Sequence, residues 1–342
     1  MQSFNPGALA SSNRTLFAGW GITSSKNPKI CCVNFSDFEE DNPKLRLLKI
    51  VAFARFVKFE RGPIRHSMKT FDTYLEEWEK NAKKDAYWSV LSSPHYETTP
   101  WDKEKFFQAG KHEIQLLQQY VADSKLPIPF HGKALDFGCG TGRLTQALGS
   151  FFQEVCGVDI SAQMISSAQE ALPEDYQNIK FIHNPSPNLK LFKDNSFDFV
   201  YSNIVLQHIA NNHQMQYIKD FARITKPGGW IIIQLPAERI YRSALGKLKG
   251  AIVNVLPYRF KKKLLVLLGN RSRALREFDS EMNTCPESRI KRLAKDNRLE
   301  IHHIAYTNSC EPDFCGNLIF RTYSEASCIP GYLSPMYFLR KY

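Results

Sequence analysis

The stretch KALDFGCGTGRLTQALGSFFQEVCGVD, Lys133–Asp159, decides the fold of this 342-residue chain. It reads as an apolar strand ending in Asp136, a glycine-rich turn, a helix and a second apolar strand ending in Asp159. Glycine has no Cβ and tolerates positive φ, so this turn lets the backbone approach a ligand closely. Free N–H groups at the helix start face the loop, and a carboxylate ending the second strand can accept from ribose hydroxyls. The unit therefore predicts a site for a cofactor that contains a nucleoside.

The spacing of the glycines separates two classes of cofactor. A dinucleotide fingerprint is G-x-G-x-x-G, with a helix N-terminus that faces a pyrophosphate. Here the spacing is G-x-G-x-G, and Arg143 occupies the place of the third dinucleotide glycine. Asp136 would repel a pyrophosphate, because it lies only two positions before the first glycine. A carboxylate there suits a ligand that carries an ammonium group.

The pattern D-x-G-x-G-x-G, with an acidic residue ending the next strand, resembles the class I S-adenosylmethionine-dependent methyltransferases. The resemblance continues in order through Ile179–His183, SFDFVYSNIVLQHI (Ser196–Ile209) and KPGGWIIIQLP (Lys226–Pro236). It implies an enzyme with S-adenosyl-L-methionine as cofactor. It also implies an α/β fold with a Rossmann-like, doubly wound, seven-stranded mixed sheet whose last strand is antiparallel. The helical block before this region is similar to the aromatic N-terminal cap of a largely uncharacterised bacterial branch of the family.

The apolar runs and turn residues predict the individual elements. We expect strands at Ala134–Phe137, Val155–Asp159, Ile179–His183, Phe197–Ser202, Trp230–Gln234, Glu300–Tyr306 and Met336–Arg340, and helices at Arg143–Phe151, Ser161–Ala171, His213–Thr225 and Glu287–Asp296. The last two strands would form the antiparallel hairpin typical of this fold, with residues 308–334 as an insertion between them. The alternative is that Leu318–Thr322 is the last true strand.

Three segments follow from composition and periodicity. Residues 1–67 predict a partly disordered or loosely packed extension, 68–130 a helical cap, and 131–342 the methyltransferase domain with a basic helical insertion at 239–276. Aromatic residues recur along the cap at helical spacing, which usually indicates packing. Caps in this family also close over the cofactor and the acceptor. Trp101, Phe106 and Phe107 could therefore contact a ligand or simply pack.

The resemblance implies cofactor contacts at the carboxyl ends of the strands, where open α/β sheets bind ligands. The expected cofactor-binding residues are Asp136 for the amino group, Gly138, Cys139 and Gly140 for the methionine portion and ribose, Asp159 for the ribose hydroxyls, Ile160 and Met164 for the adenine faces, and the backbone carbonyl of Asn203 for the amino group. Relatives commonly place an Asp after the third strand to accept from the adenine amine. Here Asn184, Pro185 and Ser186 stand there, so either Asn184 or Ser186 would have to serve.

Methyl transfer needs a positioned acceptor, and an oxygen nucleophile can need a general base. His208 is the candidate base because it follows the fourth strand and imidazole titrates near neutrality. The alternative is a purely structural His208. Tyr201 and His183 are weaker candidates, because their strand positions favour core packing. The turn after the fourth strand lacks the N-P-P-Y-like sequence and the cysteine expected of base-modifying enzymes.

The net charge of +11 is concentrated in one segment. Residues 239–276 carry eleven basic residues and no acidic residue, interleaved with leucines and valines. Such a segment indicates contact with an anionic membrane surface or an anionic ligand, or a solvated helical pair whose leucines cover the core. Nucleic acid is less favoured, because only Tyr258 and Phe260 are available there for base stacking.

Composition and cysteine usage predict a cytoplasmic protein, or one that is peripheral at a membrane surface. No run of eighteen apolar residues and no secretory signal is present. The eight cysteines form no C-x-x-C pair, so we expect no metal site and reduced thiols. The most specific hypothesis is a methyltransferase for a small-molecule or lipid-like acceptor, acting at oxygen. The alternatives are an RNA or protein methyltransferase, and a non-catalytic cofactor-binding or interaction protein.

Overall fold

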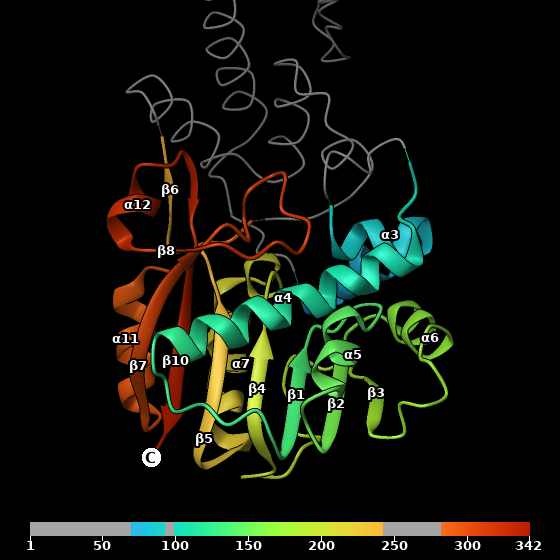
Figure 1. Ribbon diagram of the computed structural model, residues 1–342, viewed down its shortest axis with the longest axis horizontal. Helices are drawn as coiled ribbons and strands as arrows, with labels where there is room; N and C mark the ends of the chain where they lie inside the picture. The colour runs from blue at the N-terminus through green and yellow to red at the C-terminus, as the bar shows by residue number, and fades with distance from the viewer. Residues whose placement is uncertain (1–69, 93–98, 242–281) are drawn as a thin grey trace, which may run out of the picture. The chain divides into compact units, whose positions relative to one another are not determined.

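The computed structural model describes residues 70–92, 99–241 and 282–342 (Figure 1). The chain divides into two compact units, Met1–Pro63 and Ile64–Tyr342, and every described residue belongs to the second. The predicted extension at 1–67 and nearly all of the basic insertion at 239–276 lie outside the described residues. None of the helices in the described ranges is long and apolar enough to cross a membrane.

A single eight-stranded sheet organises the second unit, as Figure 1 shows. Its order is β3-β2-β1-β4-β5-β10-β7-β8, with β1 at Lys133–Phe137, β2 at Glu154–Asp159, β3 at Ile179–His183, β4 at Phe197–Ser202, β5 at Thr225–Gln234, β7 at Leu299–Thr307, β8 at Phe320–Arg321 and β10 at Pro335–Lys341. Strands β1 to β5 are parallel, and β10 is antiparallel to both of its neighbours. This confirms the Rossmann-like fold class and the antiparallel hairpin of β7 with β10.

The sheet has eight strands rather than the seven predicted. The additional strand, β8, pairs through two residues with the end of β7. The alternative that placed the last strand at Leu318–Thr322 is therefore wrong, since β10 follows it in the chain and lies inside the sheet. Within the insertion at 308–334, α12 (Tyr323–Ser327) follows β8, and β9 (Gly331–Leu333) then pairs with β6 (Glu238–Ile240) in a second, two-stranded sheet.

Successive side chains of a strand point to opposite faces, so each central strand contributes to two cores. On β5, Trp230 and Ile232 pack in one apolar cluster, whereas Ile231 and Ile233 pack in the other. The first cluster is covered by α4 (Lys103–Asp123) and α5 (Arg143–Gly149), and the second by α7 (Asn211–Ile224) and α11 (Glu287–Asp296). Burial on both faces explains why these strands read as continuous apolar runs.

Two helices precede the sheet in the region predicted as a cap. The first, α3 (Phe71–Val90), is kinked at Asp85, whose backbone is non-helical (φ −163°, ψ 95°) and whose side chain accepts from the amide of Trp88 at 3.0 Å. The second, α4, begins after Asp102, which caps it by accepting from the amide of Lys105. In Figure 1, α4 crosses one face of the sheet beside α5.

Candidate functional site

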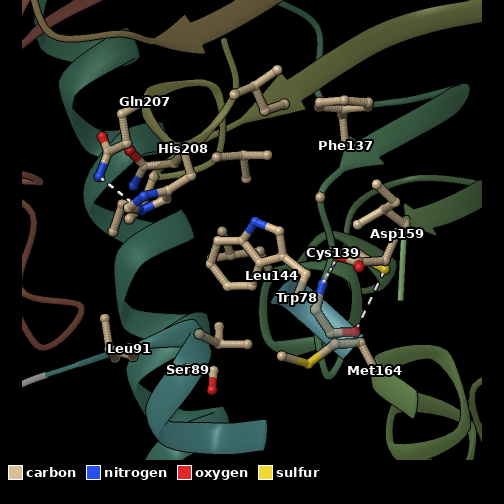
Figure 2. Close-up of a pocket in the computed structure, with 18 of the residues that line it drawn as sticks. Trp78, Ser89, Leu91, Phe137, Cys139, Leu144, Asp159, Met164, Gln207 and His208 are labelled. Carbon is tan, nitrogen blue, oxygen red and sulfur yellow. Dashed lines mark hydrogen bonds between the residues drawn. The ribbon is translucent and has the colours of Figure 1, made fainter. Parts of the chain in front are cut away.

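A cavity of about 280 Å³ opens at the carboxyl ends of β1, β2 and β4. In the same measure a single water needs roughly 10–15 Å³, so the cavity has room for a much larger ligand. The side chain of Trp78 enters it from α3, and His208 from the short 3₁₀ helix η3 (Leu206–His208) (Figure 2). Every residue predicted to bind the cofactor lines the cavity: Asp136, Gly138, Cys139, Gly140, Asp159, Ile160, Met164 and Asn203.

The glycine loop after β1 depends on backbone conformations that other residues rarely adopt. Gly138 and Gly140 have φ of +73° and +53°. The amides of Gly138 and Cys139 both donate to the carbonyl of Val158 at the end of β2, at 2.8 and 3.1 Å. A Cβ at position 138 would lie 2.4 Å from Cγ1 of Val205. The loop is therefore packed against its surroundings without room for a side chain.

Gly138→Ala is expected to lower stability and abolish cofactor binding. The left-handed conformation costs an alanine roughly 1–2 kcal/mol, and the overlap with Val205 adds to that cost. The matched control is Gly228→Ala, because Gly228 has φ +80° but nothing lies within 4 Å of its would-be Cβ. In thermal unfolding, Gly228→Ala should lose less stability than Gly138→Ala does. In calorimetric titration, Gly228→Ala should bind the cofactor as the wild type does. Equal effects of the two substitutions would contradict the packed loop.

Asp159 ends β2 and ties the loop to the start of α6 (Ala162–Glu170). Its Oδ2 accepts from the amide of Gly140 and its Oδ1 from the amide of Ser161, both at 2.9 Å. Burial raises the pKa of Asp159, and these backbone hydrogen bonds oppose that rise. A carboxylate has about four acceptor positions, so both oxygens can still accept from the hydroxyls of a ligand.

Asp136 is the most perturbed acid of the site. The residue is 2% exposed, and the hydroxyl of Thr145 donates to Oδ2 at 2.6 Å. Burial raises its pKa to about 7, although Thr145 and Arg143 lower it. A cationic ligand beside this carboxyl group would favour its charged form, since an opposite charge stabilises the ionised state. This is the electrostatic environment that an ammonium group requires.

A buried polar cluster lies next to Asp136 and was not predicted. Glu113 of α4 is fully buried, and Arg143 at the start of α5 places Nη2 2.8 Å from Glu113 Oε2. The other oxygen of Glu113 accepts from Asn203 Nδ2 at 2.8 Å and from the hydroxyl of Tyr201 at 3.4 Å. A sequence signal existed, because Glu113 falls on the apolar stripe of α4 between Gly110 and Ile114. A charge on such a stripe indicates a buried partner.

Of the two residues considered for the adenine amine, one lines the cavity and the other does not. Asn184 lines the cavity, and its Nδ2 donates to the carbonyl of Asn188 at 2.8 Å. Its amide oxygen is thereby left as the atom that could accept from an adenine amine. Ser186 is not among the lining residues, and its carbonyl accepts from the hydroxyl of Tyr217. The geometry favours Asn184 of the two alternatives.

The opposite end of the cavity is more aromatic. The rings of Trp78 and His208 meet edge to face, with centroids 5.4 Å apart. Gln207 Nε2 lies 3.4 Å from His208 Nε2 (Figure 2). The thiol of Cys310 donates to Gln207 Oε1 at 3.2 Å, and burial raises its pKa to about 12, which keeps it a neutral donor. Gln234 in turn donates to the sulfur of Cys310.

Several sequence-based candidates lie elsewhere. Tyr201 is fully buried and bonded to Glu113, and His183 is an exposed residue whose Nε2 lies 3.0 Å from the carbonyl of Ile160. The sequence predicted that both side chains pack in the core. This prediction is confirmed for Tyr201 and is wrong for His183. The cap aromatics Trp101, Phe106 and Phe107 do not line the cavity. Phe106 packs against both of the others, and Phe106 and Phe107 meet the ring of Tyr87 edge to face. The aromatic residues of α3 that line it are instead Phe71, Tyr74 and Trp78.

The described ranges contain no group of three or more His, Cys, Asp or Glu residues that could hold a metal ion. The part of the chain that carries the cavity matches a known family. Residues 135–233 match the family model described as a methyltransferase domain.

Three relatives illustrate this similarity. The chain is 31% identical over 41% of its length to trans-aconitate 2-methyltransferase of Variovorax paradoxus, and 36% identical over 29% to demethylmenaquinone methyltransferase of Staphylococcus aureus. It is 28% identical over 46% of its length to ubiquinone biosynthesis O-methyltransferase of Thiobacillus denitrificans. These matches span 51%, 41% and 66% of the three relatives.

The fold, the glycine loop and the family match together define the class. The chain contains a class I S-adenosylmethionine-dependent methyltransferase domain, as the sequence predicted. S-adenosyl-L-methionine is the cofactor of this class. The residues that contact it in this chain, and the acceptor of the methyl group, remain predictions.

Proposed function

We propose that this protein transfers a methyl group from S-adenosylmethionine to an oxygen atom of a small-molecule or lipid-like acceptor. The observation that carries the proposal is the continuous cavity. It joins the strand ends at Asp136 and Asp159 to an aromatic and polar compartment at Trp78, His208 and Cys310. One end suits the cofactor, and the other leaves space for a second molecule beside it.

The residues present fit the cofactor. The backbone of the glycine loop lines the cavity, a Cβ at position 138 would overlap the side chain of Val205, and Asp136 offers a carboxylate to an ammonium group. Asp159 is the expected partner of the ribose, Ile160 and Met164 of the adenine faces, and Asn184 of the adenine amine. When bound, S-adenosylmethionine supplies an electrophilic methyl group on a sulfonium.

The acceptor compartment supports a small apolar or aromatic molecule. Phe71, Tyr74 and Trp78 give it an apolar wall on α3, and Phe314 adds to this wall from the loop after β7. The relatives named for trans-aconitate, demethylmenaquinone and ubiquinone biosynthesis all bear the names of small-molecule methyltransferases, which favours the same class here. Contact with a membrane surface or an anionic ligand was predicted from residues 239–276, which lie almost wholly outside the described ranges and lend no support here.

S-adenosylmethionine held at Asp136 and Asp159 would supply its methyl group to an acceptor hydroxyl in the compartment at Trp78 and His208, and would leave as S-adenosylhomocysteine. His208 accepts the proton of the acceptor hydroxyl, because its ring lines the same compartment. Trp78 packs against this ring and limits its orientation, while Gln207 lies within 3.4 Å of its Nε2.

His208→Gln is expected to lower kcat by roughly 100-fold or more, since general-base catalysis typically contributes 10²–10⁴-fold. The affinity for S-adenosylhomocysteine should stay unchanged. His131→Gln is the matched control, because His131 is exposed and lies outside the cavity, so kcat and this affinity should both stay unchanged. A variant at position 208 with wild-type kcat would contradict the role as base.

The proposal is tested by a methyl-transfer screen with radiolabelled cofactor. Fractionated small molecules, lipids, RNA and proteins serve as acceptors in parallel reactions. Label in a small-molecule or lipid fraction that is released by alkali, which cleaves methyl esters, or by hydriodic acid, which cleaves methyl ethers, supports it. Label confined to RNA or protein would overturn the acceptor class, and absence of cofactor binding would overturn the enzyme itself.

A further inference from the structure

A chain of buried hydrogen bonds borders the acceptor compartment at the carboxyl ends of β5 and β7. Gln234 ends β5, Thr307 ends β7, and Ser334 directly precedes β10. Ser309 follows β7 by two residues and lines the cavity next to Cys310. The four polar residues of this chain are each 4% exposed or less, and Ser309 is the one among them that lines the cavity: Gln234, Thr307, Ser309 and Ser334.

The direction of the hydrogen bonds in this chain is fixed from one end. The amide of Ile204 can only donate, and it donates to Gln234 Oε1 at 3.0 Å. Gln234 therefore presents its Nε2 on the other side, where it donates to Ser334 Oγ at 2.8 Å. Ser334 Oγ lies 3.3 Å from Thr307 Oγ1, and the hydroxyl of Thr307 donates to Ser309 Oγ at 3.0 Å. A hydroxyl has a single hydrogen, and no residue of the described ranges accepts the hydrogen of Ser309. Ser309 therefore accepts from the protein and can donate into the cavity.

The first donor of the chain has an unusual backbone conformation. Ile204 follows β4 and has φ of +62°, which is an outlier for a β-branched residue. Such conformations persist where the surrounding structure fixes them, and they cluster at ligand sites. Ile204 itself lines the cavity, and its amide bonds to Gln234. Because hydrogen bonds in a chain polarise one another, this amide strengthens the hydroxyl of Ser309 as a donor.

Ser309 lies on the side of the cavity away from the expected cofactor contacts. Those contacts follow β1 to β4, whereas β7 is separated from β4 by β5 and β10. Neighbouring strands lie about 4.8 Å apart, so the ends of β4 and β7 are about 14 Å apart along this edge. A ligand group that accepts from Ser309 therefore belongs to the methylated molecule rather than to the cofactor.

A neighbouring charge separates two kinds of oxygen that could accept from Ser309. Glu311 also lines the cavity, and Arg321, outside the cavity, pairs with its carboxylate. A carboxylate oxygen of a ligand at Ser309 would lie near this negative charge, and like charges side by side are unfavourable. A neutral carbonyl oxygen avoids this repulsion. It also has no hydrogen of its own, so it can only accept.

We propose that Ser309 is a specificity-determining residue whose hydroxyl donates to a neutral carbonyl oxygen of the methylated molecule. Thr307 is a positioning residue, because it holds the hydroxyl of Ser309 and touches no ligand itself. This inference rests on the proposed function for the presence of a second molecule beside the cofactor. It narrows that molecule to one that carries a ketone, ester or amide besides the hydroxyl that is methylated.

A structural role is the competing explanation, because the chain also ties together the ends of β5, β7 and β10. The two explanations differ in what they predict for a pair of ligands that differ only in a carbonyl oxygen. A structural chain affects both ligands alike. A recognition hydroxyl penalises the ligand without the carbonyl, because the buried donor is then left unpaired.

The test compares the three hydroxyacetophenones with the three ethylphenols in calorimetric titrations of the full chain saturated with S-adenosylhomocysteine. The members of each pair share the ring, the position of the hydroxyl and the size, and differ in the carbonyl oxygen. In at least one pair the wild type should bind the ketone about 5- to 150-fold more tightly, which corresponds to about 1–3 kcal/mol for an unpaired buried donor. In Ser309→Ala this preference should fall below about threefold.

Thr307→Val tests the positioning role, because it keeps Ser309 and removes the hydroxyl that donates to it. Its preference for the ketone should lie between those of the wild type and Ser309→Ala. Thr225→Val is the matched control, since Thr225 is also buried, donates to the carbonyl of Phe221 and lies outside the cavity. This control should keep the wild-type preference. A wild-type preference in Thr307→Val would overturn the role of Thr307.

Equal affinity for both members of every pair, or binding of none of the six compounds, would overturn the inference while leaving the proposed function intact. A ketone preference that survives in Ser309→Ala would overturn it as well. A wild-type protein that does not bind S-adenosylhomocysteine would overturn the proposed function, whereas a ketone preference that Ser309→Ala loses would still support Ser309 as the donor.

Discussion

Asp136→Asn is expected to stabilise the ligand-free protein at about pH 8 and to weaken binding of S-adenosylmethionine by about 30-fold or more. Burial raises the pKa of Asp136 from 3.8 to about 7, so the folded state holds a proton that the unfolded state has already released between these values. Stability therefore falls as pH rises through this window, and the charged form remains costly above it. Asparagine carries no charge, so the variant avoids the cost of burying a charged carboxylate. It also lacks the charge that attracts an ammonium group, and losing one partner of a buried charge pair weakens binding by about 2 kcal/mol or more.

Thermal unfolding as a function of pH checks the first part of this prediction. The melting temperature of Asp136→Asn should exceed that of the wild type at about pH 8, and the difference should shrink towards about pH 4. Calorimetric titration checks the second part. Wild-type affinity for the cofactor should also fall as pH drops below about 7, because a proton then competes with the ligand.

Asp198→Asn is the matched control on the same sheet. Asp198 accepts from Lys226 and from the amide of Lys133, and these bonds lower its pKa despite partial burial. Its charged form is therefore favoured in the folded state, and the neutral variant should lose stability above the ordinary pKa of an aspartate. Asp198 does not line the cavity, so cofactor binding should be unchanged. A loss of stability in Asp136→Asn at about pH 8 would contradict the electrostatic account of Asp136.

Asp159→Ala is expected to weaken cofactor binding by about 10- to 100-fold. The substitution removes the expected acceptor for the ribose hydroxyls, with hydrogen bonds worth roughly 1.5–3 kcal/mol. It also leaves the amides of Gly140 and Ser161 without the carboxylate that now holds them. The second effect loosens the loop, so the stability of the ligand-free protein should fall as well.

The two effects of this substitution can be separated with a 2′-deoxy analogue of S-adenosylhomocysteine. Wild-type protein should discriminate against the analogue, and Asp159→Ala should bind both compounds with nearly equal affinity. Ser161→Ala serves as control, because it removes the side-chain cap of α6 and the contact with Glu79 but keeps the carboxylate of Asp159. If Asp159→Ala still prefers the ribose compound as strongly as the wild type does, the ribose contact lies elsewhere.

The parallel half of the sheet could be predicted almost to the residue, because its strands are apolar runs bounded by turn residues, and β1, β2 and β4 are buried on both faces. Strands β3 and β4 have the predicted bounds. Strand β5 begins at Thr225 instead of Trp230, since a register shift between Phe197 and Phe199 of β4 lets Thr225 pair with Phe197. Strand β8 lies inside Leu318–Thr322, which the sequence offered only as an alternative last strand, and a two-residue strand leaves too short a pattern to fix its place in the sheet.

The residues of the cavity wall and of the buried cluster around Glu113 could be identified only from the tertiary structure. Two aromatic stripes at helical spacing precede the glycine loop, and the sequence alone does not show which one faces the ligand. The structure places Trp78 in the cavity and Phe106 in the core. The contact of Glu113 with Asn203 joins residues 90 positions apart, and such a pairing has no signature in a single sequence.

The kinked helix α3 has a consequence for how this protein can be altered. Glu79 on α3 accepts from the hydroxyl of Ser161 at 2.7 Å, at the N-terminus of α6, while Trp78 faces His208 one residue earlier. A deletion or a grafted replacement of α3 would therefore remove an anchor of the loop after Asp159 together with the aromatic wall of the proposed acceptor compartment. Point substitutions at Phe71 or Tyr74 avoid that loss, because the glycine loop stays intact. Libraries that aim to change the accepted molecule should vary these side chains and keep Glu79.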